Sequence, residues 1–264
     1  MIKPPINLAF IFSSTFLISC GIADRNHQGG EWQTLFNGRD LDDWVVKLHR
    51  HELGDNYADT FRIVDDVIQV NYDQYDEFGE RFGHLFYKEP FSSYHLKFEY
   101  RFTDQWLEDA PSYAYRNSGI MFHSQAPGTI LKDQDWPISV EYQMLVSRGD
   151  GEPRPTGNMC SPGTDVVYEG EVDERHCINS SSDTYKTGEW IQGELIVHGD
   201  SRVIHKVNGE TVLEYSQPQI GGGVVGGYDP DIKRDGAPLT EGYIALQSEG
   251  QGIEFRDIKI KPLD

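Results

Sequence analysis

Strictly alternating apolar and polar residues mark the longest strand that the sequence predicts. Over residues 94–102 the side chains of Tyr94, Leu96, Phe98, Tyr100 and Phe102 fall on one face, and polar or charged side chains alternate with them on the other. A period of two residues is typical of an antiparallel strand with one buried face. The segment is therefore predicted to lie in a sheet that packs on a core.

Shorter runs of the same kind recur along the chain, at residues 61–70, 118–123, 138–146, 190–198, 202–207, 211–215, 243–248 and 253–260. Between two of them, Asn208-Gly209 predicts a type I′ hairpin turn, because both residues tolerate a positive φ. No long segment has the period of an amphipathic helix. The predicted fold class is all-β, a jelly-roll sandwich of two antiparallel sheets.

Two stretches rich in Gly and Pro, residues 147–189 and 216–240, separate these predicted strands. Loops of this length in a compact domain usually build or cover a site, and solvated insertions without function are the alternative. The first stretch also carries Cys160 and Cys177. In an exported protein this pair predicts a disulfide, with a metal site or free thiols as the alternatives.

The first residues of the chain predict export. Lys3 is followed by an apolar run over residues 6–18, which is too short to span a membrane and suits a secretory signal peptide over residues 1–19. The run ends in Leu-Ile-Ser-Cys-Gly at 17–21, which resembles a bacterial lipobox and makes Cys20 the predicted site of lipidation. An ordinary signal peptide with an incidental cysteine is the alternative.

Small polar residues over 20–30 predict a tether, and residues 31–264 the folded domain. The expected location is the bacterial cell envelope, with contact to the membrane through the lipid anchor only. The chain carries 23 Lys and Arg against 43 Asp and Glu, a formal net charge of −20. This charge excludes nucleic acid as a partner, because binding to phosphate backbones needs a basic surface.

Polar residues on the predicted strands supply the candidate chemistry. Alternation places Glu141 and Gln143 on one face of their strand, and Asn117 and His123 on one face of theirs. We expect these four side chains to line one groove. A concave sheet face with such residues is typical of sugar binding when aromatic side chains are added.

Further candidates share faces elsewhere. Gln247 and Glu249 do so near the end of the chain, Arg101 lies on the polar face of the 94–102 strand, and Trp136 lies in an adjoining loop. The histidines that could act as a base, a metal ligand or a structural donor are His84, His123 and His176. Their spacing does not decide between these roles.

Six motifs occur in order: residues 35–44 (LFNGRDLDDW), 117–120 (NSGI), Glu141-x-Gln143, 188–190 (GEW), 207–209 (VNG) and 242–249 (GYIALQSE) followed by 254–258 (EFRDI). Together they resemble the 3-keto-disaccharide hydrolase domain family over about residues 31–263. The resemblance implies a concanavalin-like jelly roll, distantly similar to family 16 glycoside hydrolases. It also implies a bacterial envelope protein that acts on glycosides, such as glucosides or disaccharides, with a ketone at C3.

The resemblance also bears on mechanism. Family 16 enzymes place carboxylates in a Glu-x-Asp-x-x-Glu pattern, whereas this strand continues from Glu141 through Gln143 to Val146 without the second and third carboxylates. A retaining hydrolase needs two carboxyl groups about 5 Å apart. A C3 ketone acidifies the C2 hydrogen, so the aglycone can leave C1 by β-elimination with one base, one oxyanion stabiliser and one acid.

The resulting hypothesis makes Glu141, His123 or His84 the base that removes the C2 proton. Arg101, or a divalent metal ion held by Glu141 and His123, stabilises the enolate. The residues assigned to substrate binding are Asn117, Gln143, Gln247, Glu249, Trp136 and His176. Water addition to the glycal would complete hydrolysis here or on a partner enzyme, and a sugar oxidoreductase is the expected partner that makes the ketone.

Two other function classes compete with this hypothesis. A non-catalytic carbohydrate-binding envelope lipoprotein would use the same concave face, as laminin-like and lectin-like jelly rolls do. A purely structural envelope protein leaves the polar strand faces unexplained.

Overall fold

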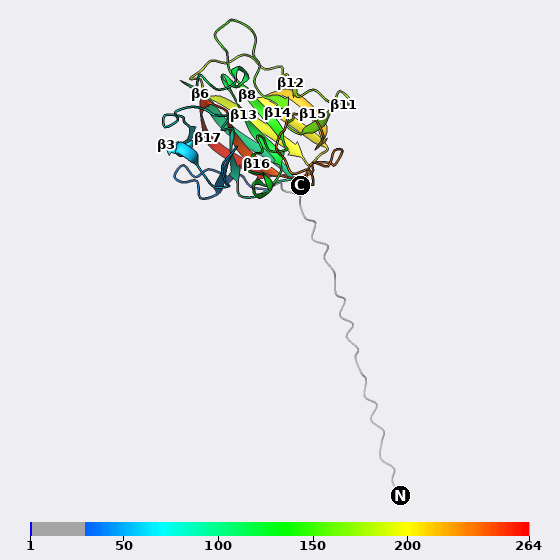
Figure 1. Cartoon of the computed structure of the whole chain (residues 1–264). Coiled ribbons are helices and arrows are strands. Elements are labelled where there is room, and N and C mark those ends of the chain that lie inside the picture. Colours follow the sequence, from blue (N-terminus) through cyan, green and yellow to red (C-terminus); the bar gives the residue numbers. More distant parts are fainter. Residues whose placement is uncertain (2–29, 264) are drawn as a thin grey trace.

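The computed structural model describes Met1 and residues 30–263, in which two antiparallel sheets pack face to face (Figure 1). The predictions for residues 2–29, which include the signal peptide, Cys20 and most of the tether, lie outside the described part of the chain. Within that part, no helix is both long and apolar enough to cross a membrane.

The larger sheet is built from β1 (Gln33–Thr34), β3 (Phe61–Val64), β4 (Val67–Val70), β6 (Ser93–Trp106), β10 (Thr164–Tyr168), β11 (Glu171–Asp173), β13 (Ile191–His198), β14 (Arg202–Val207), β15 (Glu210–Ile220) and β17 (Gln251–Pro262). Its strand order is β11-β10-β15-β14-β13-β6-β17-β4-β3, and β1 pairs with β17 beside this path. The long strands β6 and β17 lie next to each other near the middle of the order.

The smaller sheet is built from β2 (Trp44–Leu48), β5 (Gly83–Tyr87), β7 (Asn117–Ser124), β8 (Val140–Leu145), β9 (Asn158–Cys160), β12 (Cys177–Ile178) and β16 (Tyr243–Ser248). Its strand order is β12-β9-β8-β7-β16-β5-β2. Within residues 30–263, three short 3-10 helices lie in connections between strands: η1 (Tyr57–Asp59), η2 (Ser112–Ala114) and η3 (Pro127–Thr129). The predicted all-β sandwich is confirmed.

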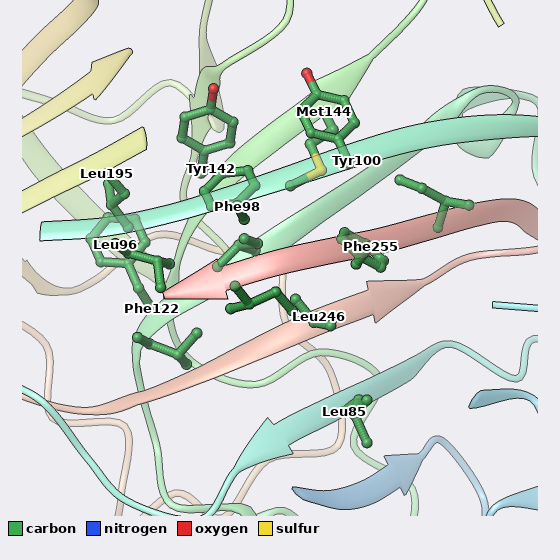
Figure 2. Close-up of a cluster of buried hydrophobic side chains, with 14 of the residues drawn as sticks. Leu85, Leu96, Phe98, Tyr100, Phe122, Tyr142, Met144, Leu195, Leu246 and Phe255 are labelled. Atoms are coloured by element: carbon green, nitrogen blue, oxygen red, sulfur yellow. The ribbon is translucent and has the colours of Figure 1, made fainter. Parts of the chain in front are cut away.

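The core lies between the two sheets and takes the apolar face of β6, as the alternation predicts. All five apolar side chains of that face, from Tyr94 to Phe102, are at most 1% exposed. Figure 2 shows Leu96, Phe98 and Tyr100 of this face together with side chains of the smaller sheet. Phe98 meets Tyr142 edge to face, with ring centroids 5.2 Å apart. Burying one such aromatic side chain stabilises the fold by about 2–3 kcal/mol.

Two hairpins show how local backbone chemistry sets strand boundaries. Asn208 and Gly209 have φ of 48° and 85°, which confirms the predicted type I′ turn between β14 and β15. Residues 61–70, predicted as one run, form β3 and β4 instead. Asp65 and Asp66 have φ of 50° and 62°, so the chain reverses between the two strands.

The long stretch over residues 147–189 is not a plain loop. It adds β9 and β12 to the smaller sheet and β10 and β11 to the larger one. Cys160 of β9 lies directly opposite Cys177 of β12, and the two sulfur atoms form a disulfide with an S–S length of 2.06 Å. The predicted disulfide is confirmed, and it joins the edge strand of the smaller sheet to its neighbour.

Replacing both cysteines, C160A together with C177A, should lower the free energy of unfolding by about 3 kcal/mol, since the bond closes a loop with a sequence separation of 17. Urea denaturation of the double variant and the parent protein measures the difference. A reducing agent should shift the midpoint of the parent protein and leave that of the double variant unchanged. An unchanged midpoint in the double variant would contradict a stabilising role.

Candidate active site

The outer face of the smaller sheet carries the polar side chains of its strands. In β8, Tyr142 and Met144 belong to the core, so Glu141 and Gln143 point to the outer face. In β16 the same alternation buries Leu246 in the core. Glu141 and Gln143 therefore share one face of β8, as the sequence predicts.

A glycine makes room for Glu141 near the centre of this face. In the pairing of β7 with β8, Met121 lies opposite Glu141 and Gly119 lies opposite Gln143. A Cβ atom on Gly119 would lie 2.3 Å from Oε1 of Glu141. The carboxyl group therefore lies over the bare backbone of β7, a close approach that a side chain on this residue would block.

A cavity of about 520 Å³ opens on the same face. This volume lies within the range of small-molecule sites, roughly 300–1,000 Å³. The lining residues are Tyr113, Asn117, Trp136, Glu141, Gln143, Leu145, Arg148, Arg154, Pro162, His176, Cys177, Val224 and Glu249. The two stretches at 147–189 and 216–240 both contribute to this lining, which supports the expectation that they border a site.

Two buried carboxyl groups face this cavity. Glu141 is 5% exposed and Glu249 is 3% exposed, and Trp136 donates its indole N–H to Oε1 of Glu249 at 3.2 Å. Burial raises the pKa of Glu141 well above its usual value, and the charge of Glu249 raises it further. Burial also raises the pKa of Glu249 to about 7, against the opposing effect of the Trp136 hydrogen bond. The pair therefore holds a proton near neutral pH.

Several buried polar atoms around this pair lack a hydrogen-bond partner among the described residues. They include Oδ1 of Asn117, Oε2 of Glu249, Oε1 of Gln247 and Nε2 of His84. Buried polar groups are nearly always paired, so such a cluster points to a site for a polar ligand. Asn117 and Glu249 line the cavity itself.

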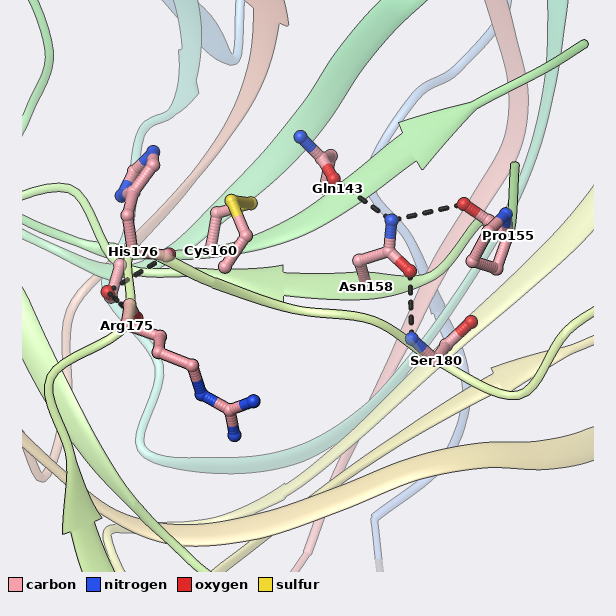
Figure 3. Close-up of a disulfide and its surroundings, with 9 residues drawn as sticks. Gln143, Pro155, Asn158, Cys160, Arg175, His176 and Ser180 are labelled. Carbon is pink, nitrogen blue, oxygen red and sulfur yellow. Dashed lines mark hydrogen bonds between the residues drawn. A yellow bond between two sulfur atoms is a disulfide. The ribbon is translucent and has the colours of Figure 1, made fainter. Parts of the chain in front are cut away.

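Gln143 is held in one orientation by a network behind it (Figure 3). Asn158 donates its amide N–H to Oε1 of Gln143 at 3.0 Å and to the carbonyl of Pro155 at 3.0 Å. In return, Oδ1 of Asn158 accepts the backbone N–H of Ser180 at 2.8 Å. Because the oxygen of Gln143 is already used, its NH₂ group is the part left to donate into the cavity.

His84 and Gln247 lie opposite each other on β5 and β16 but do not line the cavity. They are 2% and 1% exposed, whereas Trp136 and Glu249 line the cavity. Burial, with a smaller effect of the Lys47 cation, lowers the pKa of His84 to about 3, so its imidazole is neutral at physiological pH. The structure thus places the predicted base His84 beside the site.

The prediction that His123 shares a groove with Glu141 is wrong. A φ of 46° at His123 breaks the alternation of β7, so its side chain leaves the face that Gly119 occupies. Its Nε2 atom lies 2.9 Å from the carbonyl oxygen of Gly199, in the turn between β13 and β14 of the other sheet. His123 can therefore supply neither the base nor a metal ligand at this cavity.

The prediction that Arg101 stabilises an enolate is also wrong. Arg101 lies on the outer face of the larger sheet, where its Nε donates to Glu254 at 2.8 Å. Its guanidinium stacks over Trp190 at 4.5 Å from the ring centroid. The core separates this side chain from the cavity, because the outer faces of the two sheets point in opposite directions.

Metal ligands are grouped at one place in the described part of the chain, where atoms of Cys160, His176 and Cys177 lie within 4.8 Å of one another. The two sulfur atoms are bonded to each other, so neither is a thiolate that could bind a metal ion. The predicted pair of Glu141 and His123 does not form such a group. The donor set at the carboxyl pair therefore does not fit a metal centre built from these residues.

Two charged residues of the cavity, and one buried lysine outside its lining, are not predicted by the sequence patterns. Arg148 and Arg154 lie in an irregular segment, where no alternation tells which side chains face a cavity. The buried Lys47 lies opposite His84 in the pairing of β2 with β5, and its Nζ donates to the carbonyls of Leu48 and His51 at 2.9 and 3.1 Å. A lysine in the apolar run WVVKL is the signal that marks this last position.

The sequence matches the 3-keto-alpha-glucoside-1,2-lyase-like domain family over residues 31–261. A search of curated proteins finds no match to the chain. Among solved structures, a predicted glycosyl hydrolase from Parabacteroides distasonis ATCC 8503 is 21% identical with a TM-score of 0.54, covering 89% of this chain and 94% of its own.

A second predicted glycosyl hydrolase from Parabacteroides distasonis is 19% identical with a TM-score of 0.53, covering 88% of this chain and 100% of its own. The exoplasmic/lumenal domain of VIP36, solved with Ca²⁺ and Man3GlcNAc, is 7% identical with a TM-score of 0.51, covering 89% of this chain and 91% of its own. At these identities the likeness shows a shared jelly-roll fold.

The substitution E249Q should raise the free energy of unfolding at pH 8 by about 3 kcal/mol and change it little at pH 4. The folded pKa of Glu249 is raised, so its burial costs stability as the pH rises from the unfolded pKa of 4.5 to about 7. Glutamine keeps an oxygen for Trp136 and removes the charge. Urea denaturation at both pH values measures the effect, with E241Q at an exposed glutamate as the control. Equal effects of E249Q at both pH values would contradict a raised pKa.

Proposed function

Because the chain belongs to the 3-keto-alpha-glucoside-1,2-lyase-like domain family, we propose that it cleaves 3-keto-glycosides by β-elimination at the cavity on the smaller sheet. The observation that carries this proposal is the buried pair of Glu141 and Glu249, which faces one cavity and holds a proton near neutral pH. An elimination needs a base and an acid together, and such a pair supplies both.

Glu249 is the base of this proposal. The indole N–H of Trp136 donates to Oε1 of Glu249 and favours its ionised form. Its other oxygen, Oε2, has no partner among the described residues and is free to accept a proton. A pKa of about 7 is well suited to a base that works near neutral pH.

Glu141 is the acid. Burial and the neighbouring Glu249 charge keep its carboxyl group protonated. In the step, Glu249 takes the C2 proton and the C–H electrons form an enolate with the C3 ketone. As the ketone re-forms, the C1–C2 double bond forms and the C1–O bond to the aglycone breaks. Glu141 protonates the departing oxygen, and the products are an enone sugar and the free alcohol.

The amide groups of the cavity bind the sugar in this scheme. The NH₂ group of Gln143, oriented by Asn158, donates to the C3 oxygen, where negative charge develops in the enolate. Oδ1 of Asn117 accepts a hydrogen bond from a sugar hydroxyl. The hydrolysis predicted as an alternative outcome would need a later addition of water to the enone.

Turnover of a 3-keto-glucoside tests the assignment. We expect kcat/KM to rise with pH through about 7, and E249Q to reduce it by about 100-fold or more, because a general base contributes at least this much. E141Q should slow substrates with poor leaving groups most. NMR of the products should show the enone sugar. Full activity in both variants would refute the acid–base pair, and sugar binding without turnover would favour the non-catalytic carbohydrate-binding alternative.

The substitution G119A tests the geometry of the pair. A Cβ atom would lie 2.3 Å from Oε1 of Glu141, so the carboxyl group must move, and displacement of a catalytic group by about 1 Å can cost about 100-fold in rate. The control is G128A, since a Cβ atom on Gly128 meets nothing within 4 Å. We expect kcat to fall in G119A and to stay unchanged in G128A. Equal rates in the two variants would show that the position of Glu141 does not matter.

A further inference from the structure

Two arginines line the cavity at the end of β7 and β8. Arg154 donates through Nη1 to the carbonyls of Arg116 and Val146 at 3.1 and 2.8 Å. These residues lie just before Asn117 of β7 and just after Leu145 of β8, which are paired with each other. Leu145 is four residues from Glu141, a separation of about 13 Å along the strand. The cavity therefore has a carboxyl end and a guanidinium end.

Neither Arg148 nor Arg154 forms a direct ion pair among the described residues, although Asp150 and Glu152 lie in the same segment. No carboxylate of the described residues lies within 4.0 Å of either guanidinium, although the chain carries 43 acidic residues. Arg148 donates only weakly, through Nη2 to the carbonyl of Ser112 at 3.4 Å. Burial, with the nearby charges of Arg148 and Arg116, lowers the pKa of Arg154 to about 10. The guanidinium group of Arg148 therefore keeps most of its N–H donors for a ligand in the cavity.

Apolar side chains make up part of the cavity wall, beside the polar side chains of Asn117, Gln143 and His176. Leu145, Pro162 and Val224 line the cavity together with the ring of Tyr113. Tyr113 is 50% exposed and Val224 is 43% exposed, which is high for large apolar side chains. Such walls suit a flat or aliphatic body more than a second sugar ring.

We propose that Arg148 and Arg154 form a subsite for a carboxylate on the aglycone, so that the substrate class is 3-keto-glycosides of apolar acids. The inference rests on the proposed function, since it places the sugar at Glu141 and Glu249. The planar guanidinium groups can bind a carboxylate through paired N–H donors. The aglycone body then lies against the apolar side chains of the cavity, with Leu145 next to the guanidinium end.

Two matched substrates test the subsite, the 3-keto-glucosides of 4-hydroxybenzoate and of 4-hydroxybenzamide. They have the same shape and differ in charge. The measured quantity is the ratio of their kcat/KM values, compared between the parent protein and R148Q, so that differences in leaving-group strength cancel. We expect this ratio to fall by about tenfold in R148Q, as a charge-assisted hydrogen bond is lost. R202Q is the control, because Arg202 pairs with Glu214 on the other sheet.

An unchanged ratio in R148Q and in the double variant R148Q with R154Q would overturn the subsite. Arg148 is exposed, so R148Q should fold even if removing Arg154, which holds two backbone carbonyls, does not. Calorimetric binding of 4-hydroxybenzoate and 4-hydroxybenzamide separates this inference from the proposed function. If neither glucoside is cleaved, the elimination fails, while about tenfold tighter binding of the benzoate, lost in R148Q, still supports the subsite. Equal binding of the two compounds would refute it.

Discussion

The alternation of side chains along each strand is the constraint on which the rest of this structure depends. Two sheets can bury one core between them only if every strand gives its apolar side chains to the inner face. Because Tyr142 and Met144 point into that core, the alternating residues Glu141 and Gln143 point to the outer face of the smaller sheet. The same constraint sends Arg101 to the opposite outer face. The packing of the core therefore determines which polar side chains lie close enough together to form a site.

Burial of the two carboxyl groups on this face changes their pKa values. The bare backbone at Gly119 accepts the carboxyl group of Glu141, and Trp136 covers Glu249 while donating one hydrogen bond to it. Together they take two carboxyl groups out of water, which raises both pKa values at a cost in stability. A fold with a large aromatic core can tolerate this cost, and strained or costly polar groups of this kind gather at functional sites.

The sequence predicts the features that depend on the local alternation of residues. It does not predict side-chain positions where that alternation is interrupted. Alternation gave the inner face of β6, the shared face of Glu141 and Gln143, and the turn at Asn208. It could not show that a positive φ at His123 turns that side chain away, nor to which sheet the strand of Arg101 belongs. Those facts depend on pairing between distant strands. The lipid anchor at Cys20 stays a prediction from the N-terminal motif.

The acidic character of the chain bears on how the cavity can select an anion. A net charge of −20 repels an acidic ligand at long range, so electrostatic steering cannot bring it to the site. At physiological ionic strength this repulsion is screened over about 8 Å, while contacts inside a partly buried cavity are screened much less. Selection must therefore come from short-range contact with Arg148 and Arg154 and not from the field of the whole surface. A repulsive surface with a basic cavity end would also reject anions too large to enter, since they meet only the acidic exterior.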